Sequence, residues 1–248
     1  MIARLIGALL CLVVAAGCTT SDAEPPEPLV STTCADLVVL GIRGNNQAGD
    51  LNQGVGKEVL RTVTDLARRV QSRSGASVRL EAVDYDATGT ATATAYFDHV
   101  TAGARRAGRQ VDALVARCPD SRIAVVGFSQ GAQVTHELVE HVSKTLARRI
   151  ALIGMIADPR RNPADPIRHW SYANTPVPRP GLLGPGPAVD ADVRAAAISF
   201  CHDADEVCNG RGVRGERTSA AHRFFYERPA TVQVTAAQLD DVLRANGV

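Results

Sequence analysis

The sequence lacks an excess of charge of either sign, and it lacks an internal repeat. It has 27 lysine and arginine residues against 26 aspartate and glutamate residues, and the two kinds are interspersed along the chain. A basic patch of the kind that binds nucleic acid is therefore not predicted. The absence of a repeat excludes a solenoid or propeller. With 248 residues, the chain fits one domain with a substantial core.

The N-terminus lacks an apolar run long enough to span a bilayer comfortably. Arg4 is followed by the apolar stretch 5–16, so we expect 1–17 to be a secretory signal peptide. The stretch ends in Ala15-Ala-Gly-Cys18, which resembles a bacterial lipobox. Lipidation of Cys18 would hold the protein on a membrane. Because Ala15 stands where lipoboxes usually have leucine, ordinary secretion with cleavage nearby stays open.

The cysteines include no C-x2-C pair, so clustered Cys and His residues do not predict a metal site. Outside the leader and Cys18, four remain. These are Cys34, Cys118, Cys201 and Cys208. An even number in an exported chain indicates two disulfides, with three possible pairings. Cys34 and Cys118 each precede a strand, and these strands are expected to be neighbours. A Cys201–Cys208 bridge would close a small loop.

Apolar runs of strand length alternate with amphipathic segments after a polar, proline-containing tether at 18–33. Strands are predicted over 36–41, 78–83, 122–126, 150–157 and 195–200. Helices are predicted over about 55–72 and 95–117. A third helix is predicted after residue 129, with a stripe of apolar residues that continues to Leu146. A last helix is predicted to begin at Thr235, with Gln238 three residues later completing a capping box. This alternation predicts a single α/β domain over 34–248. Its fold would be a three-layer sandwich with a five-stranded, mainly parallel sheet and helices on both faces.

The stretch 159–194 differs from the rest of the chain. It holds most of the prolines, three glycines and the exposed-looking pair Leu182-Leu183. We expect a long irregular excursion from the sheet. Long loops in compact domains are usually functional.

Gly127-Phe-Ser129-Gln-Gly131 directly follows the predicted strand 122–126 and precedes a helix. A strand-to-helix turn this sharp has room only for glycine on either side of the serine. The turn would expose the Ser129 hydroxyl at the edge of the sheet, where it is a candidate nucleophile. The backbone N–H of Gln130 and one from the loop after the first strand, at Asn45, are candidate oxyanion donors.

A nucleophilic serine needs a base, and the base needs an orienting carboxylate. His222 lies in a loop before the last helix, from which it can reach over the sheet, and it is the preferred base. The other histidines after Ser129 are His136 and His141, expected at the surface and pointing away, His169 in the excursion, and His202 beside the acid candidates. Asp203, Asp205 and Glu206 follow the last strand and compete as the acid.

These residues resemble the cutinase family of serine esterases, and specifically its actinobacterial cutinase-like branch. The resemblance runs from Cys34 to about Tyr226. It rests on Arg43-Gly-Asn45, the Gly127–Ala132 elbow, Asp158-Pro-Arg-Arg-Asn-Pro163 and Cys201-x3-Asp205-x2-Cys208. The resemblance implies an α/β-hydrolase-like fold, Asp205 as the acid and His222 as the base. It also implies Gln130 and Asn45 as oxyanion donors, and the pairings Cys34–Cys118 and Cys201–Cys208.

The implied activity is hydrolysis of acyl esters through a Ser129–His222–Asp205 triad, with no metal and no cofactor. Asn45 stands where fungal members commonly have Ser or Thr, and the excursion is longer than in small fungal cutinases. The substrate is therefore not carried over from the family. Phospholipase, thioesterase, acetylxylan esterase and mycolyl esterase activities stay open, as does a catalytically idle surface lipoprotein. We expect an exported monomer, anchored to a membrane or free outside the cell.

Overall fold

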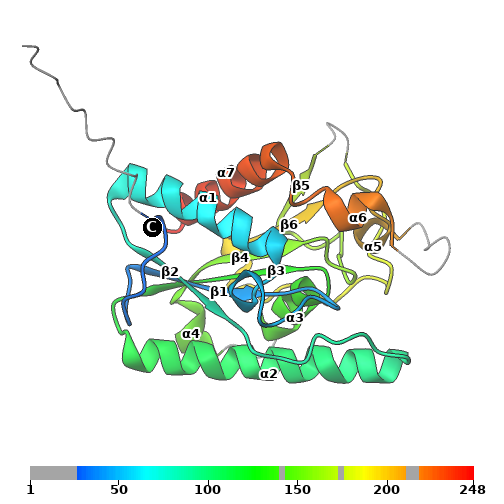
Figure 1. Cartoon of the computed structure of the whole chain (residues 1–248), viewed down its shortest axis with the longest axis horizontal. Coiled ribbons are helices and arrows are strands. Elements are labelled where there is room, and N and C mark those ends of the chain that lie inside the picture. Colours follow the sequence, from blue (N-terminus) through cyan, green and yellow to red (C-terminus); the bar gives the residue numbers. More distant parts are fainter. Residues whose placement is uncertain (1–26, 140–142, 173–175, 211–217) are drawn as a thin grey trace, which may run out of the picture.

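The computed structural model describes residues 27–139, 143–172, 176–210 and 218–248. The predicted signal peptide, the Cys18 lipidation site and most of the predicted tether lie outside these ranges, as does His141. The described chain folds into three layers, with a central sheet between two sets of helices (Figure 1). The predicted three-layer α/β fold is confirmed.

The sheet has six strands in the order β2-β1-β3-β4-β6-β5, and every pairing is parallel. The strands are β1 (Leu37–Ile42), β2 (Val78–Ala82), β3 (Arg122–Phe128), β4 (Ile150–Ile156), β5 (Arg168–Ser171) and β6 (Ala197–Cys201). The side chains of β1 and β4 are buried throughout, and those of β3 are buried from Ile123 onward. Continuous burial on both faces explains their uninterrupted apolar sequences.

The predicted number of five strands is wrong, because the sixth strand, β5, lies inside the 159–194 excursion. Its sequence, Arg-His-Trp-Ser, has no apolar run, and its side chains are exposed or half-buried. It forms an edge of the sheet by pairing with β6 from Arg168 to Ser171. A four-residue edge strand needs no buried face, so hydrophobic periodicity does not detect it.

Helices cover both faces of the sheet. α1 (Lys57–Ser74) and α7 (Pro229–Ala245) pack together on one face (Figure 1). α2 (Ala93–Arg117), α3 (Gln130–Val139) and α4 (Lys144–Ala147) lie on the other face. The short elements are α5 (Glu206–Asn209), α6 (Ala220–Phe224) and the 3-10 turns Asn52–Gly54 and Arg194–Ala196. Apolar clusters fill the space between the sheet and each helical layer.

The start of the last helix differs from the prediction. α7 begins at Pro229 rather than at Thr235, because proline is favoured in the first turn of a helix, where its missing N–H costs no hydrogen bond. The Thr235 hydroxyl instead donates to the Thr231 carbonyl within the helix. The stripe expected to continue from α3 to Leu146 is described as far as Val139 in α3, and Leu146 lies in α4. The three residues between them lie outside the described ranges.

The described part of the chain contains two disulfides, which lie at opposite ends of the sheet. Cys34–Cys118 joins the segments that precede β1 and β3, which are adjacent strands. Cys201–Cys208 closes a small loop at the carboxyl end of β6. The carboxyl ends of parallel strands form the edge of the sheet where ligands usually bind in open α/β folds. The second disulfide therefore lies where a site is expected.

Candidate active site

The turn between β3 and α3 places Ser129 in a backbone conformation that few residues other than glycine adopt, with φ +54°. Its N–H donates to the Ile156 carbonyl on β4, which fixes the turn to the sheet. The flanking glycines are sterically required. A Cβ at Gly127 would lie 2.1 Å from the Gly131 carbonyl oxygen, and one at Gly131 would lie 2.2 Å from the Ile42 carbonyl oxygen. The strain at Ser129 is thus held by close backbone packing.

The structure brings Ser129 together with His222 and Asp205. His222 Nε2 lies 2.9 Å from Ser129 Oγ, and His222 Nδ1 lies 3.0 and 3.1 Å from the two carboxylate oxygens of Asp205. Asp205 is fully buried, while Ser129 and His222 are 9% and 6% exposed. The three side chains form one hydrogen-bonded chain. Its outer end, at Ser129 and His222, reaches a cavity.

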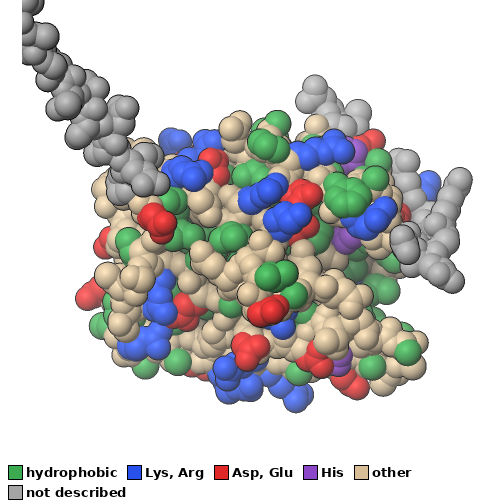
Figure 2. Space-filling view, viewed as in Figure 1, with side chains coloured by type: hydrophobic (Ala, Val, Ile, Leu, Met, Phe, Trp, Pro, Cys, Tyr) green, Lys and Arg blue, Asp and Glu red, His purple; other side chains and the backbone are tan. Residues whose placement is uncertain are grey.

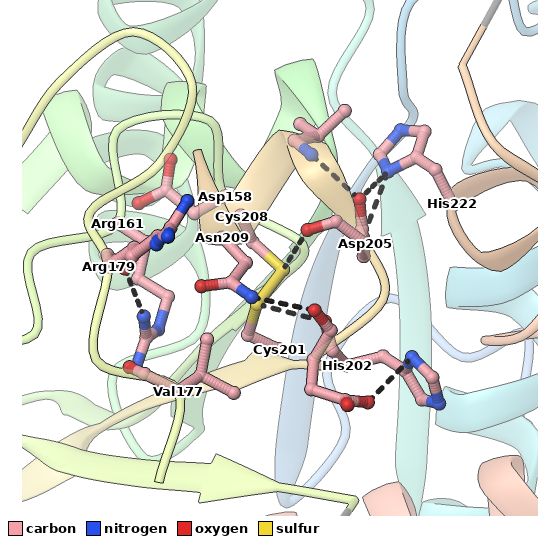
Figure 3. The surroundings of a disulfide bond; sticks show 12 residues. Asp158, Arg161, Val177, Arg179, Cys201, His202, Asp205, Cys208, Asn209 and His222 are labelled. Carbon is pink, nitrogen blue, oxygen red and sulfur yellow. Dashed lines mark hydrogen bonds and ion pairs between the residues drawn. A yellow bond between two sulfur atoms is a disulfide. The ribbon is translucent and has the colours of Figure 1, made fainter. Parts of the chain in front are cut away.

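Asp205 is the one carboxylate of the three candidates that contacts His222, and it points toward the imidazole beside the Cys201–Cys208 disulfide (Figure 3). It caps α5 by accepting the Val207 N–H at 2.9 Å. Glu206 instead accepts the Ser219 N–H, and the Asp203 side chain is 44% exposed. The disulfide loop therefore turns Asp205 inward and leaves its neighbours to other contacts.

Tyr226 is a fourth member of this network that the sequence analysis did not identify. Its hydroxyl donates to Asp205 Oδ2 at 2.8 Å and accepts the His202 N–H at 2.9 Å. Burial raises the pKa of Tyr226 well above its ordinary value, so the hydroxyl keeps its proton and remains a donor. No local pattern in the sequence marks it, because α6 ends at Phe224 and Tyr226 lies beyond the helix that carries His222.

His222 is also held by an aromatic contact. The Phe128 ring stacks on the imidazole, with centroids 5.1 Å apart and planes inclined by 22°. Phe128 is the residue immediately before the serine. The elbow therefore positions one face of the histidine as well as the hydroxyl that it contacts.

The two predicted oxyanion donors lie on the same edge of the sheet as Ser129. Gln130 is the first residue of α3, so its N–H has no acceptor within the helix. Asn45 follows β1 in a loop that passes close to the elbow, since a Cβ on the adjacent Gly44 would lie 3.1 Å from the Phe128 ring. Ser129 and Asn45 line the same cavity.

That cavity has a volume of about 600 Å³. Its wall combines apolar side chains with polar ones, and Asn45 and Gln47 come from the loop after β1. The lining includes Phe97, Phe128, Leu182, Leu183, Asn45, Gln47, Glu58, Ser129 and His222. Leu182 and Leu183 are 38% and 39% exposed, which agrees with their exposed appearance in the sequence. A larger hollow of about 900 Å³ beside β5 contains none of the three hydrogen-bonded residues.

The remaining histidines do not approach Ser129 in the part of the chain that the structure describes. The expectation that His136 lies at the surface is wrong, because it is 3% exposed. Its Nδ1 lies 2.8 Å from Asp158 Oδ2, and its Nε2 lies 2.8 Å from the Pro187 carbonyl oxygen. The 159–194 excursion packs over this side of α3, and helical periodicity alone does not predict that cover. His169 contacts the Asp165 carbonyl, and His202 lies near Asp203.

The described residues include no cluster of three or more His, Cys, Asp or Glu side chains arranged to hold a metal ion. Within the same ranges, no helix combines the length and apolar character needed to cross a membrane. Basic and acidic side chains are interspersed on the face seen in Figure 2, as in the sequence.

Known proteins are similar to this chain over most of its length. The cutinase family model matches residues 33–236. Cutinase CUT1 of Coprinopsis cinerea is 31% identical over 167 residues, a match that covers 65% of this chain and 79% of that protein. Carboxylesterase Culp1 of Mycobacterium tuberculosis is 25% identical over 238 residues, covering 91% of this chain and 94% of that protein.

Solved structures show the same fold. The catalytic core of acetyl xylan esterase from Trichoderma reesei superposes with a TM-score of 0.61 at 19% identity, covering 86% of this chain and 99% of that one. The family match extends from the residue before Cys34 into the last helix, so it includes the elbow, the disulfide loop and His222. The chain belongs to the cutinase family of carboxylic ester hydrolases.

Proposed function

We propose that the chain hydrolyses acyl esters through a covalent acyl-enzyme on Ser129. The observation that carries this proposal is the continuous hydrogen-bonded chain from Ser129 Oγ through His222 to Asp205, with contacts of 2.9 and 3.0 Å. A serine, an imidazole and a buried carboxylate in this order are the parts of a nucleophilic triad. The 2.9 Å contact is within the range needed for proton transfer.

In acylation, His222 Nε2 takes the Ser129 proton as Oγ attacks the ester carbonyl carbon. The imidazolium then gives that proton to the alkoxide oxygen as the carbon–oxygen bond breaks and the alcohol leaves. Asp205 keeps the Nδ1 proton facing itself and stabilises the cation. In deacylation, water attacks the acyl carbon and His222 takes one of its protons. The imidazolium then returns that proton to Ser129 Oγ as the acyl carbon–Oγ bond breaks, which releases the acid and the free serine.

The negative oxygen of each tetrahedral intermediate needs two donors. The Gln130 N–H, at the start of α3, and the Asn45 N–H, on the loop after β1, are the donors that the elbow arrangement supports. The positive end of the α3 dipole lies at the same point and favours a developing anion.

The cavity favours an ester with an apolar acyl part. Phe97, Leu182 and Leu183 form an apolar part of the wall of the cavity that Ser129 also lines, and both leucines are partly exposed. A volume of about 600 Å³ is within the range of ordinary ligand pockets. We therefore propose an acyl ester substrate. Activity on a series of p-nitrophenyl esters would give the preferred length of the acyl chain. Activity on phospholipid and polymer substrates would show which alcohol part the enzyme accepts.

We also propose that the protein acts outside the cytoplasm. Two disulfides in a chain of this size are typical of an oxidising compartment. The segment 1–17 and Cys18 would provide export and a lipid anchor. Mass spectrometry of the mature N-terminus distinguishes an acylated Cys18 from a free secreted form.

The experiment that tests the activity compares the wild type with Ser129→Ala on a short p-nitrophenyl ester. We expect kcat to fall by about 10⁶, the order of loss found when a triad serine is removed. The variant removes one oxygen atom, so its unfolding temperature should stay close to that of the wild type. Substantial residual hydrolysis by a folded Ser129→Ala variant would contradict the proposal, as would an inactive wild type.

A further inference from the structure

Gln47 closes the loop that carries Asn45. The Gly44 N–H donates to Gln47 Oε1 at 2.6 Å, and the Gln47 N–H donates to the Gly44 carbonyl at 3.2 Å. Asn46 is held separately, because its N–H donates to the Ala87 carbonyl at 2.6 Å. Asn45 therefore lies between two anchored residues, and the direction of its backbone N–H depends on these bonds.

Glu58 fixes the orientation of the Gln47 side chain. Gln47 Nε2 donates to Glu58 Oε2 at 2.6 Å, so the amide nitrogen faces the carboxylate and the amide oxygen faces the Gly44 N–H. An amide turned the other way would present N–H groups to the Gly44 N–H and an oxygen to the carboxylate, and both contacts would be repulsive. Glu58 lies in the first turn of α1 and is 5% exposed.

The packing around this pair leaves it little freedom. Gly56 has φ +80°, and a Cβ there would lie 2.1 Å from Gln47 Oε1. A side chain at this position would push the amide out of place. Gln47 and Glu58 also line the cavity that contains Ser129 and His222, so the pair lies beside the reacting groups rather than in a remote part of the core.

We infer that Glu58 and Gln47 are positioning residues that hold the Asn45 N–H where it binds the oxyanion during ester hydrolysis. This inference rests on the proposed function. Glu58 acts through Gln47 and Gly44 and does not itself touch the reacting atoms. Burial raises the pKa of the Glu58 carboxyl, and the hydrogen bond from Gln47 opposes that effect.

The test compares Glu58→Ala with Glu58→Gln on a p-nitrophenyl ester. In Glu58→Ala the Gln47 amide loses its acceptor, and we expect kcat to fall about 10- to 100-fold with little change in KM, because small misplacements of a catalytic group have effects of this size. Glu58→Gln keeps an oxygen that can accept from Gln47 Nε2, so it should stay close to wild type. Lys57→Ala, an exposed change in the same helical turn, is the matched control.

A trifluoromethyl ketone inhibitor reads the same effect without turnover, because its adduct with Ser129 carries an oxyanion. Glu58→Ala should raise the inhibition constant by the factor that it lowers kcat/KM. Unchanged kcat and inhibition constant in folded Glu58→Ala would overturn the inference, as would equal losses in Glu58→Gln. If Glu58→Ala does not fold, Gln47→Met removes the two side-chain bonds at similar volume, and its kcat decides in the same way. Failure of the proposed function would instead appear as an inactive wild type.

Discussion

The serine half and the acid–base half of the site are held in place by different means. The elbow, 127–131, joins two buried elements and is fixed by backbone packing around two glycines. The proposed acid and base, Asp205 and His222, lie on short elements after β6 and are fixed by a disulfide, a tyrosine and side-chain hydrogen bonds. The elbow is therefore held by close backbone packing within the turn and against β1 and β4, whereas the other half depends on side-chain contacts and a disulfide.

The largest fall in kcat from a change in one half alone is expected from Asp205→Asn. The asparagine can still cap α5 but presents no negative charge to His222, so kcat should fall by about 10⁴. Unfolding temperature and the elbow should change little. Asp203→Asn, an exposed neighbour, is the control for a change of charge in the same loop. If kcat fell as much in Asp203→Asn as in Asp205→Asn, the assignment of Asp205 as the acid would be wrong.

Gly131→Ala breaks the serine half instead. The added methyl group would meet the Ile42 carbonyl oxygen at 2.2 Å, so the backbone must shift and carry Ser129 with it. We expect kcat to fall about 100-fold or more, since a misplacement of about 1 Å has that effect, and the variant should unfold at lower temperature. Gly108→Ala is the matched control, because its methyl group would have a nearest contact of 3.6 Å. A Gly131→Ala enzyme with wild-type kcat and melting temperature would show that the elbow tolerates a side chain.

Tyr226→Phe sharpens the comparison within the acid–base half. It removes one donor to the buried Asp205 carboxylate and leaves the His202 N–H without its acceptor. We expect kcat to fall about tenfold, the kinetic equivalent of one hydrogen bond to a charged group. Tyr172→Phe removes a part-buried hydroxyl that contacts Thr235, so it should affect stability alone. Equal kcat values for Tyr226→Phe and Tyr172→Phe would show that the Tyr226 hydroxyl does not contribute to the reaction.

The two disulfides should separate stability from activity. Replacing Cys34 and Cys118 by serine opens a link with a sequence separation of 84 and should lower the free energy of unfolding by about 4.5 kcal/mol in the chain-entropy model. The Cys201–Cys208 link, with a separation of 7, contributes about 2.5 kcal/mol in that model but encloses Asp205. Its loss should lower kcat severalfold at a temperature where the protein stays folded. Denaturant melts and kinetics on both double variants test this. The account is wrong if the Cys34/Cys118 variant loses more kcat and the Cys201/Cys208 variant loses more stability.

The same contrast explains what the sequence could predict about the fold. Strands such as Leu37–Ile42 and Ile150–Ile156 are apolar throughout because both of their faces are buried, so they are visible as apolar runs. The edge strand Arg168–Ser171 has no such run and was missed. The burial of His136 was also missed, because it depends on the excursion that covers α3.

Within the site, Ser129 was identified from five consecutive residues, because the glycine spacing that the turn requires is local. His222 was preferred from its place in the chain, and Asp205 was distinguished from Asp203 and Glu206 only by resemblance to a family. The direction of a carboxylate in a small loop depends on the turn that the loop takes, which residue types do not specify. Tyr226 was overlooked for the same reason, since its role exists only once Asp205 is in place.

The measurement that tests the central claim most directly is peptide mapping of the chain after reaction with a fluorophosphonate. His222 Nε2 lies 2.9 Å from Ser129 Oγ, and we propose that it activates this hydroxyl. The account therefore predicts one adduct per chain, on Ser129, and much slower labelling of His222→Ala. Labelling of another serine, no adduct on the folded wild type, or equally fast labelling of the two proteins would contradict it.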